Sequence, residues 1–136
     1  MSAAVTVNAR PAPPLPASAR EAARLAEAVA RTLDLADSDF DLLLTDDLEI
    51  AELNLSFLGL TGPTNVLSFE DEEGEGLGSI VISVDAVERE SMLYGQNPLE
   101  HFARLLAHGL LHLSGMEHGD EMYELTERAV EAAAGG

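Results

Sequence analysis

Apolar and polar residues follow two periods along the chain, and these periods predict its strands and helices. Alternation by two, or a short apolar run bounded by polar residues, indicates a strand. Recurrence of apolar residues at every third or fourth position indicates a helix with one buried face. By these criteria strands are expected at 5–7, 40–44, 66–69 and 77–84.

Five helices are expected from the apolar stripes and from the residues that begin or end a helix. Ser18 and Glu21 form a capping box, and the stripe behind them runs to about Leu33. The second helix is expected to begin in segment 45–47 and to end before Gly59. The third is expected to be capped by Asp85 with Glu88, and the fourth to have Asn97 as its cap and Pro98 as its first residue. The last helix is expected over about 120–133.

The order of these elements indicates an α+β fold. It predicts a single small mixed β-sheet of about four strands, with about five helices packed on it. A length of 136 residues suits one domain over 1–136, in which 1–16 holds the first strand and a proline-rich connector. The acidic segment 70–76 is expected to be a hairpin loop, since its five acids lack the Asp and Gly offsets of a calcium loop.

The composition restricts the compartment and the chemistry. The chain has no cysteine, which excludes disulfides and thiolate ligands and leaves imidazole and carboxylate as the strong metal ligands. No apolar run approaches the roughly 20 residues of a membrane span, and the first 16 residues lack a secretion signal. We therefore expect a cytoplasmic protein without membrane contact.

The charge is strongly negative and unevenly placed. Asp and Glu number 25 against seven arginines, for a net charge of −18. The first 31 residues hold four Arg and two Glu, or +2, so the remainder carries −20. The arginine stripe, defined as Arg20, Arg24 and Arg31, is the possible contact surface for RNA, and a solvated helix face is the alternative. The acidic excess could also reflect a salty cytosol, where salt screens self-repulsion.

Three of the four histidines fall within 11 residues and have the spacing of a metal site. His108 and His112 are one helical turn apart, so their rings can bind one ion. Gly115 permits the chain to leave the helix and places His118 as a third ligand. Three nitrogen ligands leave one position of a zinc ion open to water, whose pKa then falls to about 7. The pattern predicts one catalytic zinc per chain.

The same histidine spacing occurs in metzincin peptidases, and the residue after the first histidine distinguishes such a peptidase from other metal sites with this spacing. Such a peptidase needs a glutamate there to take a proton from the metal-bound water. This chain has Gly109 at that position, so the peptidase interpretation is disfavoured.

The motif His-Gly-x-Leu-His-Leu-x-Gly-x-acid-His over 108–118 resembles the signature of the YbeY family of bacterial endoribonucleases. Upstream, Leu53-Asn54 followed by the segment 62–69, Gly-Pro-Thr-Asn-Val-Leu-Ser-Phe, is similar to that family's second motif. The resemblance implies a zinc-dependent endoribonuclease in ribosomal RNA maturation and ribosome quality control, with a metal-bound water as nucleophile. It also implies ribosomal RNA and the small ribosomal subunit as partners.

Two departures from the family pattern favour an alternative. Leu58 stands where the family usually carries an arginine, and Ser79 replaces an aspartate in a Gly-Asp-Ile sequence. Losing an arginine removes a bidentate phosphate ligand. The alternative is therefore a weakly catalytic or non-catalytic ribosome-assembly or RNA-binding factor that keeps the metal site. A third hypothesis, separate from these departures, is a metallohydrolase acting on another ester or amide.

Three other residues are candidates near the site. Arg104 lies one turn before the first histidine and could contact phosphate, or it could pair with Glu100. Glu117 is a candidate proton acceptor or a surface residue. His101 is expected to be structural or to contact substrate at the cleft mouth, because about 10.5 Å along the helix separates it from His108.

Overall fold

The computed structural model describes residues 3–7, 19–35, 38–71, 76–117 and 119–135. These residues form four strands and five helices, in the order expected. Along the chain they are β1 (Ala3–Val7), α1 (Ala19–Thr32), β2 (Phe40–Thr45), α2 (Asp47–Leu58), β3 (Val66–Glu70), β4 (Gly78–Ser83), α3 (Val84–Tyr94), α4 (Pro98–Leu113) and α5 (Asp120–Gly135).

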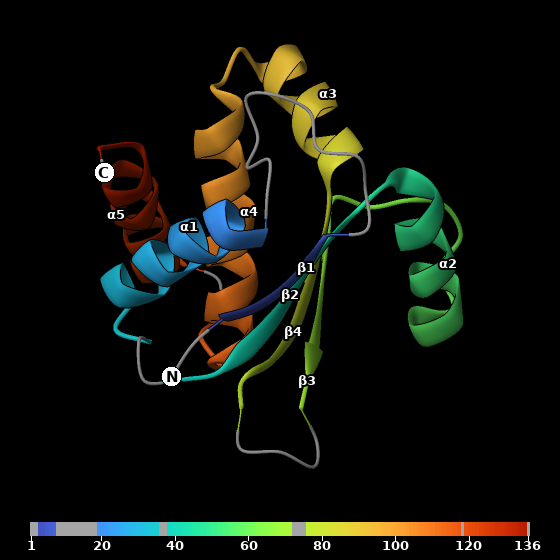
Figure 1. The fold of residues 1–136 in the computed structure, drawn as a ribbon, viewed down its shortest axis with the longest axis horizontal. Helices are drawn as coiled ribbons and strands as arrows, with labels where there is room; N and C mark the ends of the chain where they lie inside the picture. Colours follow the sequence, from blue (N-terminus) through green and yellow to red (C-terminus); the bar gives the residue numbers. More distant parts are fainter. Residues whose placement is uncertain (1–2, 8–18, 36–37, 72–75, 118, 136) are drawn as a thin grey trace.

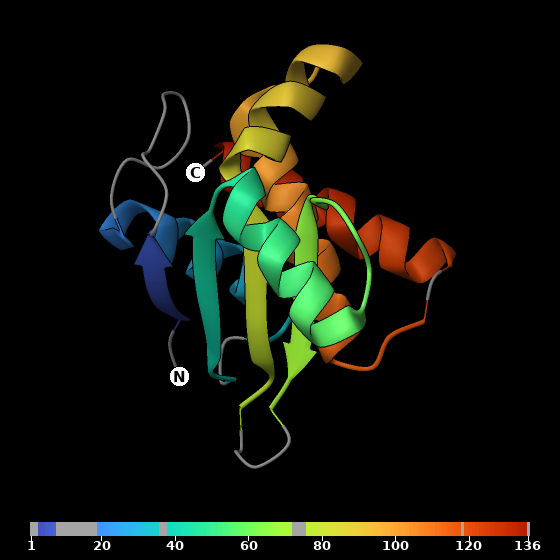
Figure 2. The same ribbon diagram turned by 90° about the vertical axis from the view of Figure 1, so that its right-hand side faces the viewer.

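The four strands form one mixed sheet in the order β1-β2-β4-β3, which confirms the predicted α+β class. β1, β2 and β4 are parallel, and β3 is antiparallel to β4. Helices α1, α4 and α5 lie on one face of the sheet and α2 on the other (Figure 1). Figure 2 shows α2 crossing in front of the strands. None of the helices in the described ranges is long and apolar enough to cross a membrane.

Side chains that alternate in direction along the strands divide the core into two layers. On β4, Ile80 and Ile82 are fully buried on the face covered by α1, α4 and α5. Val81, between them, is buried on the opposite face together with Leu67 of β3 and Ile50 of α2. This is the period-two burial of a strand that is covered on both faces.

Helix α4 is the central helix of the larger layer. The Asn97 side chain caps it by accepting two backbone N–H bonds of 2.9 and 3.3 Å, and Pro98 occupies its first turn, as expected. Phe102, Leu106 and Leu110 are completely buried along one face. Helix α5 packs against α4 and α1, and α3 packs against α4. The core therefore fixes α4, which carries the first two candidate metal ligands.

The expected start of α3 was wrong. We expected Asp85 to cap this helix, but Ser83 is the cap, and its Oγ accepts a 3.2 Å bond from the backbone N–H of Ala86. Strand β4 passes directly into α3 without a loop, so the last strand residue, still extended, takes the cap position. The Asp85 carboxylate instead accepts a 3.0 Å bond from the backbone N–H of Asp47, at the start of α2.

The same junction predicts a pH-dependent contribution to stability. Burial tends to raise the pKa of Asp47, but hydrogen bonds from Arg89, at 2.9 Å, and Ser83, at 2.8 Å, outweigh burial and bring that pKa below its ordinary value of 3.8. A lowered carboxylate pKa stabilises the fold above pH 3.8, and the stabilisation is lost as the pH falls through the folded-state value. We expect Asp47→Asn to reduce the free energy of unfolding at pH 7 by about 0.5–1 kcal/mol, the range of partly exposed ion pairs.

Urea unfolding of wild type and Asp47→Asn across a pH series measures this difference. It should shrink toward zero in acid well below pH 3.8. Glu88→Gln, which removes an exposed carboxylate of α3, is the control and should be close to neutral. A difference that stays constant over the whole pH range would reject the electrostatic explanation.

Candidate metal centre and adjoining cavities

Helix α4 brings the first two candidate ligands together. The Nε2 atoms of His108 and His112 are 3.0 Å apart, and the two rings lie at 81° with centroids 4.5 Å apart. Two nitrogens bound to one tetrahedral zinc at about 2.0–2.1 Å are roughly 3.3 Å apart. His108 is half-buried and His112 is exposed at the surface. The pair thus fits a shared metal ion that is open to solvent on one side.

The chain reverses after α4, as the glycine in the motif predicted. Gly115 has a positive φ of 91°, and the backbone N–H of Met116 donates a 3.1 Å bond to the carbonyl of Leu111. Gly119, beyond the turn, lines a cavity that His108 also lines, so the chain returns toward the end of α4. The chain after Gly115 therefore runs near His108, as a further metal ligand shortly after this glycine would require.

The third predicted ligand, His118, lies outside the described residues, so the three-histidine set remains a prediction. In the part of the chain that the structure describes, no group of three or more His, Cys, Asp or Glu side chains is placed to hold a metal. Glu117, which precedes His118, is exposed. The structure thus leaves the Glu117 carboxylate accessible to solvent.

Gly109 allows α4 to lie directly against the sheet. A Cβ atom at this position would stand 3.1 Å from Ser68 Oγ and 3.3 Å from Ile80 Cδ1, closer than ordinary van der Waals contact. A larger side chain would have to displace these atoms. The absence of a peptidase-type glutamate therefore has a packing reason, and Ser68 of the second motif touches the helical turn that carries the histidine pair.

The other residues of the second motif fix the connection between α2 and β3. The buried Asn54 donates a 3.0 Å bond from Nδ2 to the carbonyl of Gly62. The carbonyl of Asn65 accepts a 3.0 Å bond from the backbone N–H of Ser83. Leu58, which stands at the family arginine position, is the last residue of α2 and is 52% exposed. The motif therefore has a structural role here, and its departure from the family pattern is at the surface.

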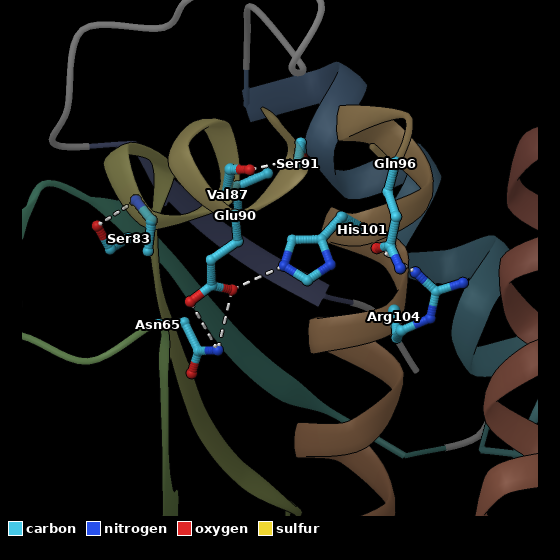
Figure 3. Close-up of polar contacts among 9 residues, drawn as sticks. Asn65, Ser83, Val87, Glu90, Ser91, Gln96, His101 and Arg104 are labelled. Carbon is cyan, nitrogen blue, oxygen red and sulfur yellow. Dashed lines mark hydrogen bonds and ion pairs between the residues drawn. The ribbon is translucent and has the colours of Figure 1, made fainter. Parts of the chain in front are cut away.

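His101 belongs to a buried polar cluster rather than to the metal pair. Its Nε2 is 2.8 Å from Glu90 Oε1, and the same carboxylate accepts a 3.2 Å bond from Asn65 Nδ2 (Figure 3). Among the described residues, His101 Nδ1 is buried without a hydrogen-bond partner. The burial of His101 and its contact with Glu90 support the structural role expected for this histidine. Sequence spacing gave no signal for Glu90, because it lies 11 residues away on another helix.

Arg104 is held mainly by a partner that the sequence analysis missed. Its Nε and Nη2 donate to the Glu127 carboxylate at 3.0 and 3.2 Å, and its Nη1 donates to Gln96 Oε1 at 2.9 Å. The Glu127 hydrogen bonds are the main cause of the raised pKa of Arg104, and Glu100, the partner we considered, contributes less. Figure 3 shows Gln96 reaching the guanidinium. Glu127 comes from α5, so only helix packing brings it to this arginine.

Two cavities adjoin these residues. The α4–α5 cavity, of about 580 Å³, is lined by Gln96, Arg104, His108, Gly119, Met122, Tyr123, Thr126 and Glu127. The β3 hollow, of about 960 Å³, is lined by Asp41, Phe57, Ser68, Phe69, Glu70, Asp71, Gly78 and Ser79. Three carboxylates line the β3 hollow, which disfavours a polyanion there. The α4–α5 cavity includes one histidine of the candidate metal pair.

The arginine stripe lies on α1, and all three of its members are exposed. Its residues are four and seven positions apart, which places them on one side of the helix. The structure thus keeps this stripe available for contact with RNA, and it is equally compatible with a solvated face.

Comparisons with known proteins agree with this fold and motif. The family model described as Endoribonuclease YbeY matches residues 15–133. A protein named Endoribonuclease YbeY from Oleidesulfovibrio alaskensis is 42% identical over 127 residues, covering 76% of this chain and 75% of that protein. One with the same name from Nitratidesulfovibrio vulgaris is 39% identical over 140 residues, covering 88% of this chain and 86% of that protein.

A solved structure has the same fold. The solution structure of TM1509 from Thermotoga maritima aligns with a TM-score of 0.72 and 24% identity, covering 98% of this chain and 89% of that one. At this identity the likeness extends to the arrangement of helices and strands only.

Proposed function

The chain belongs to the YbeY endoribonuclease family, and on this premise we propose that it cleaves RNA at a zinc ion held by His108, His112 and His118. The observation that carries the metal site is the 3.0 Å separation of the two Nε2 atoms on α4. We further propose one zinc per chain in a single domain over 1–136. Its proposed substrate is ribosomal RNA of the small subunit, in the cytoplasm.

Each residue of the site has a proposed task. A bound zinc would polarise a phosphodiester and lower the pKa of water so that hydroxide is available at neutral pH. The histidine rings would hold the ion, and the close approach at Gly109 keeps their helix against the sheet. Glu117, exposed beside the third histidine, is the proposed proton acceptor. Arg104 uses three of its five N–H donors on Glu127 and Gln96, so its two remaining N–H groups are the ones that can contact a phosphate.

A cleavage assay tests this proposal. Purified protein is incubated with a precursor of small-subunit ribosomal RNA, with zinc or with a chelator, beside His112→Ala. We expect internal cleavage only by the zinc-loaded wild type. Cleavage that persists in the chelated protein and in His112→Ala would contradict the metal mechanism.

A second candidate function is an RNA-binding or ribosome-assembly factor that retains the metal without cleaving. The exposed Leu58 at the family arginine position and the net charge of −18 favour it. In the same assay this function gives zinc binding and RNA binding with intact RNA. The third alternative, hydrolysis of another ester or amide, would be indicated by a preferred substrate that is not a nucleic acid.

The missing arginine gives a directional prediction. Leu58 follows Phe57, which lines the β3 hollow together with Ser68, the residue that touches Gly109 beside the histidine pair. A guanidinium at position 58 would restore the bidentate phosphate ligand that the family carries at this position. We expect Leu58→Arg to raise the rate of RNA cleavage roughly tenfold. This is less than the effect of a charge donor that a fold has already positioned for the reaction.

The control for this prediction is Leu48→Arg, which adds the same charge to an exposed position of α2. Ten residues of helix separate the two positions by about 15 Å. An equal increase in both variants would attribute the effect to net charge. No increase in Leu58→Arg would show that this departure does not limit activity.

The arginine stripe predicts how RNA binding depends on salt. Few cationic contacts release few counterions, so we expect the logarithm of affinity to fall with the logarithm of salt concentration with a slope of about −2 to −3. Replacing Arg20, Arg24 and Arg31 together with alanine should weaken binding and flatten this slope. Titration of ribosomal RNA fragments over a salt series measures both, with Arg128→Ala, an exposed arginine of α5, as control. Unchanged affinity and slope in the triple variant would exclude the stripe.

A further inference from the structure

We propose that the α4–α5 cavity binds a nucleobase of the RNA substrate, with the Tyr123 ring as its stacking surface. This inference rests on the proposed function and goes beyond it, because it assigns a subsite for the nucleotide next to the cleavage point. The cavity volume of about 580 Å³ is within the usual range of small-molecule sites.

The position of the cavity follows from its lining. His108 of the candidate metal pair and Gly119, just beyond the turn, border it on one side. Tyr123 and Glu127, one turn apart on α5, border it on the other. A phosphodiester bound at the histidine pair would therefore bring an adjoining base to this opening.

The charge of the cavity favours a neutral ligand over a phosphate. Its one arginine, Arg104, is bound by the Glu127 carboxylate through hydrogen bonds of 3.0 and 3.2 Å, so the two charges cancel. Apart from His108, the other described residues that line the cavity are uncharged. A phosphate would meet a cation that is already neutralised, whereas a base brings a flat apolar face with polar edges.

The side chains match both parts of a base. Tyr123 is 68% exposed beside the cavity, which leaves its ring accessible for stacking. Base stacking on an aromatic ring is tolerant of sequence and contributes substantially to binding of single strands. Gln96, fixed by its 2.9 Å bond from Arg104, adds an amide group that hydrogen-bonds to base edges.

Proton NMR of the full chain with adenosine tests the stacking directly, without metal or cleavage. The chain has two tyrosines, so Tyr123→Phe and Tyr94→Phe assign the ring signals. We expect adenosine to shift the Tyr123 ring protons upfield and to leave Tyr94, which is 61% exposed on α3, unchanged. Ribose 5-phosphate, the phosphate-bearing arm without a base, should cause no shift.

Three results would overturn the proposal. They are no shift of Tyr123 with adenosine, equal shifts of both tyrosines, and an equal shift with ribose 5-phosphate. The last would identify a phosphate site instead of a base site.

RNA cleavage by the zinc-loaded protein gives a second readout. Tyr123→Ala should lower kcat/KM by about 5- to 100-fold, while Tyr123→Phe should keep most of it, because the ring is retained. Tyr94→Ala is the matched control and should cleave like wild type. Equal losses in the two alanine variants would overturn the subsite. If wild type does not cleave RNA, the proposed function fails, and the NMR titration still decides whether the cavity binds a base.

Discussion

Alanine at His108, His112 or His118 is expected to abolish stoichiometric zinc binding and, with it, RNA cleavage. Each histidine supplies one of three proposed protein ligands, so two ligands would remain in an exposed site. Even loss of an outer residue that orients a ligand typically lowers metal affinity 10- to 100-fold, so loss of a ligand should lower it by about 100-fold or more. Metal analysis of the purified variants, with RNA cleavage measured on the same samples, checks both effects.

The fourth histidine provides the matched control. His101 bonds to Glu90 inside the fold, at 2.8 Å, and is not part of the proposed ligand set. We expect His101→Gln to bind zinc like wild type while losing about 1–3 kcal/mol of stability, because a buried hydrogen bond is disturbed. Full zinc retention by a folded His118→Ala variant would remove His118 from the ligand set. Loss of zinc from a folded His101→Gln variant would add His101 to that set.

Alanine at Gly78 is expected to cause the largest loss of stability. Gly78 has a φ of 135°, and a Cβ there would lie 2.1 Å from the carbonyl oxygen of Phe69 and 3.0 Å from Glu70 Cα. Both atoms belong to the backbone of β3, so relief of the clash requires separation of two paired strands. Strain and overpacking together predict a loss of about 3 kcal/mol or more. Urea unfolding monitored by circular dichroism measures it.

Gly95→Ala separates backbone strain from steric clash. Gly95 also has a positive φ, of 65°, but nothing lies within 4 Å of a Cβ at this position. We expect a loss of about 1–2 kcal/mol, the cost of a left-handed conformation alone. Equal losses in the two variants would show that the contact with β3 adds nothing to the effect at Gly78.

The sequence by itself determined the elements that depend on local periodicity. The pattern of apolar residues predicted strands over 40–44 and 77–84, where β2 and β4 lie, and the capping and proline signals at Asn97 and Pro98 predicted the start of α4. Because helix pitch fixes the relation between positions four apart, the spacing of His108 and His112 also predicted that their rings would meet. The glycine turn after α4 followed from the same local signals.

The sequence also showed that Gly109 lacks a peptidase-type glutamate, but only the tertiary structure showed why. The reason is that the side chains of Ser68 on β3 and Ile80 on β4 lie too close to position 109 for a larger side chain. The start of α3 likewise depended on a strand that passes directly into a helix, which apolar periodicity cannot resolve.

The pairing of polar side chains was decided by packing alone. Arg104 and Glu127 are 23 residues apart, and Asn65 and Glu90 are 25 apart, so no local period relates them. Arg104 and Glu127 meet because α5 packs on α4. Asn65 and Glu90 meet because the start of β3 pairs with the end of β4, from which α3 continues directly. The α4–α5 cavity beside His108 arises from the first of these contacts. Local spacing specifies which side chains share a face, whereas burial of that face against another element determines which charges and rings it meets.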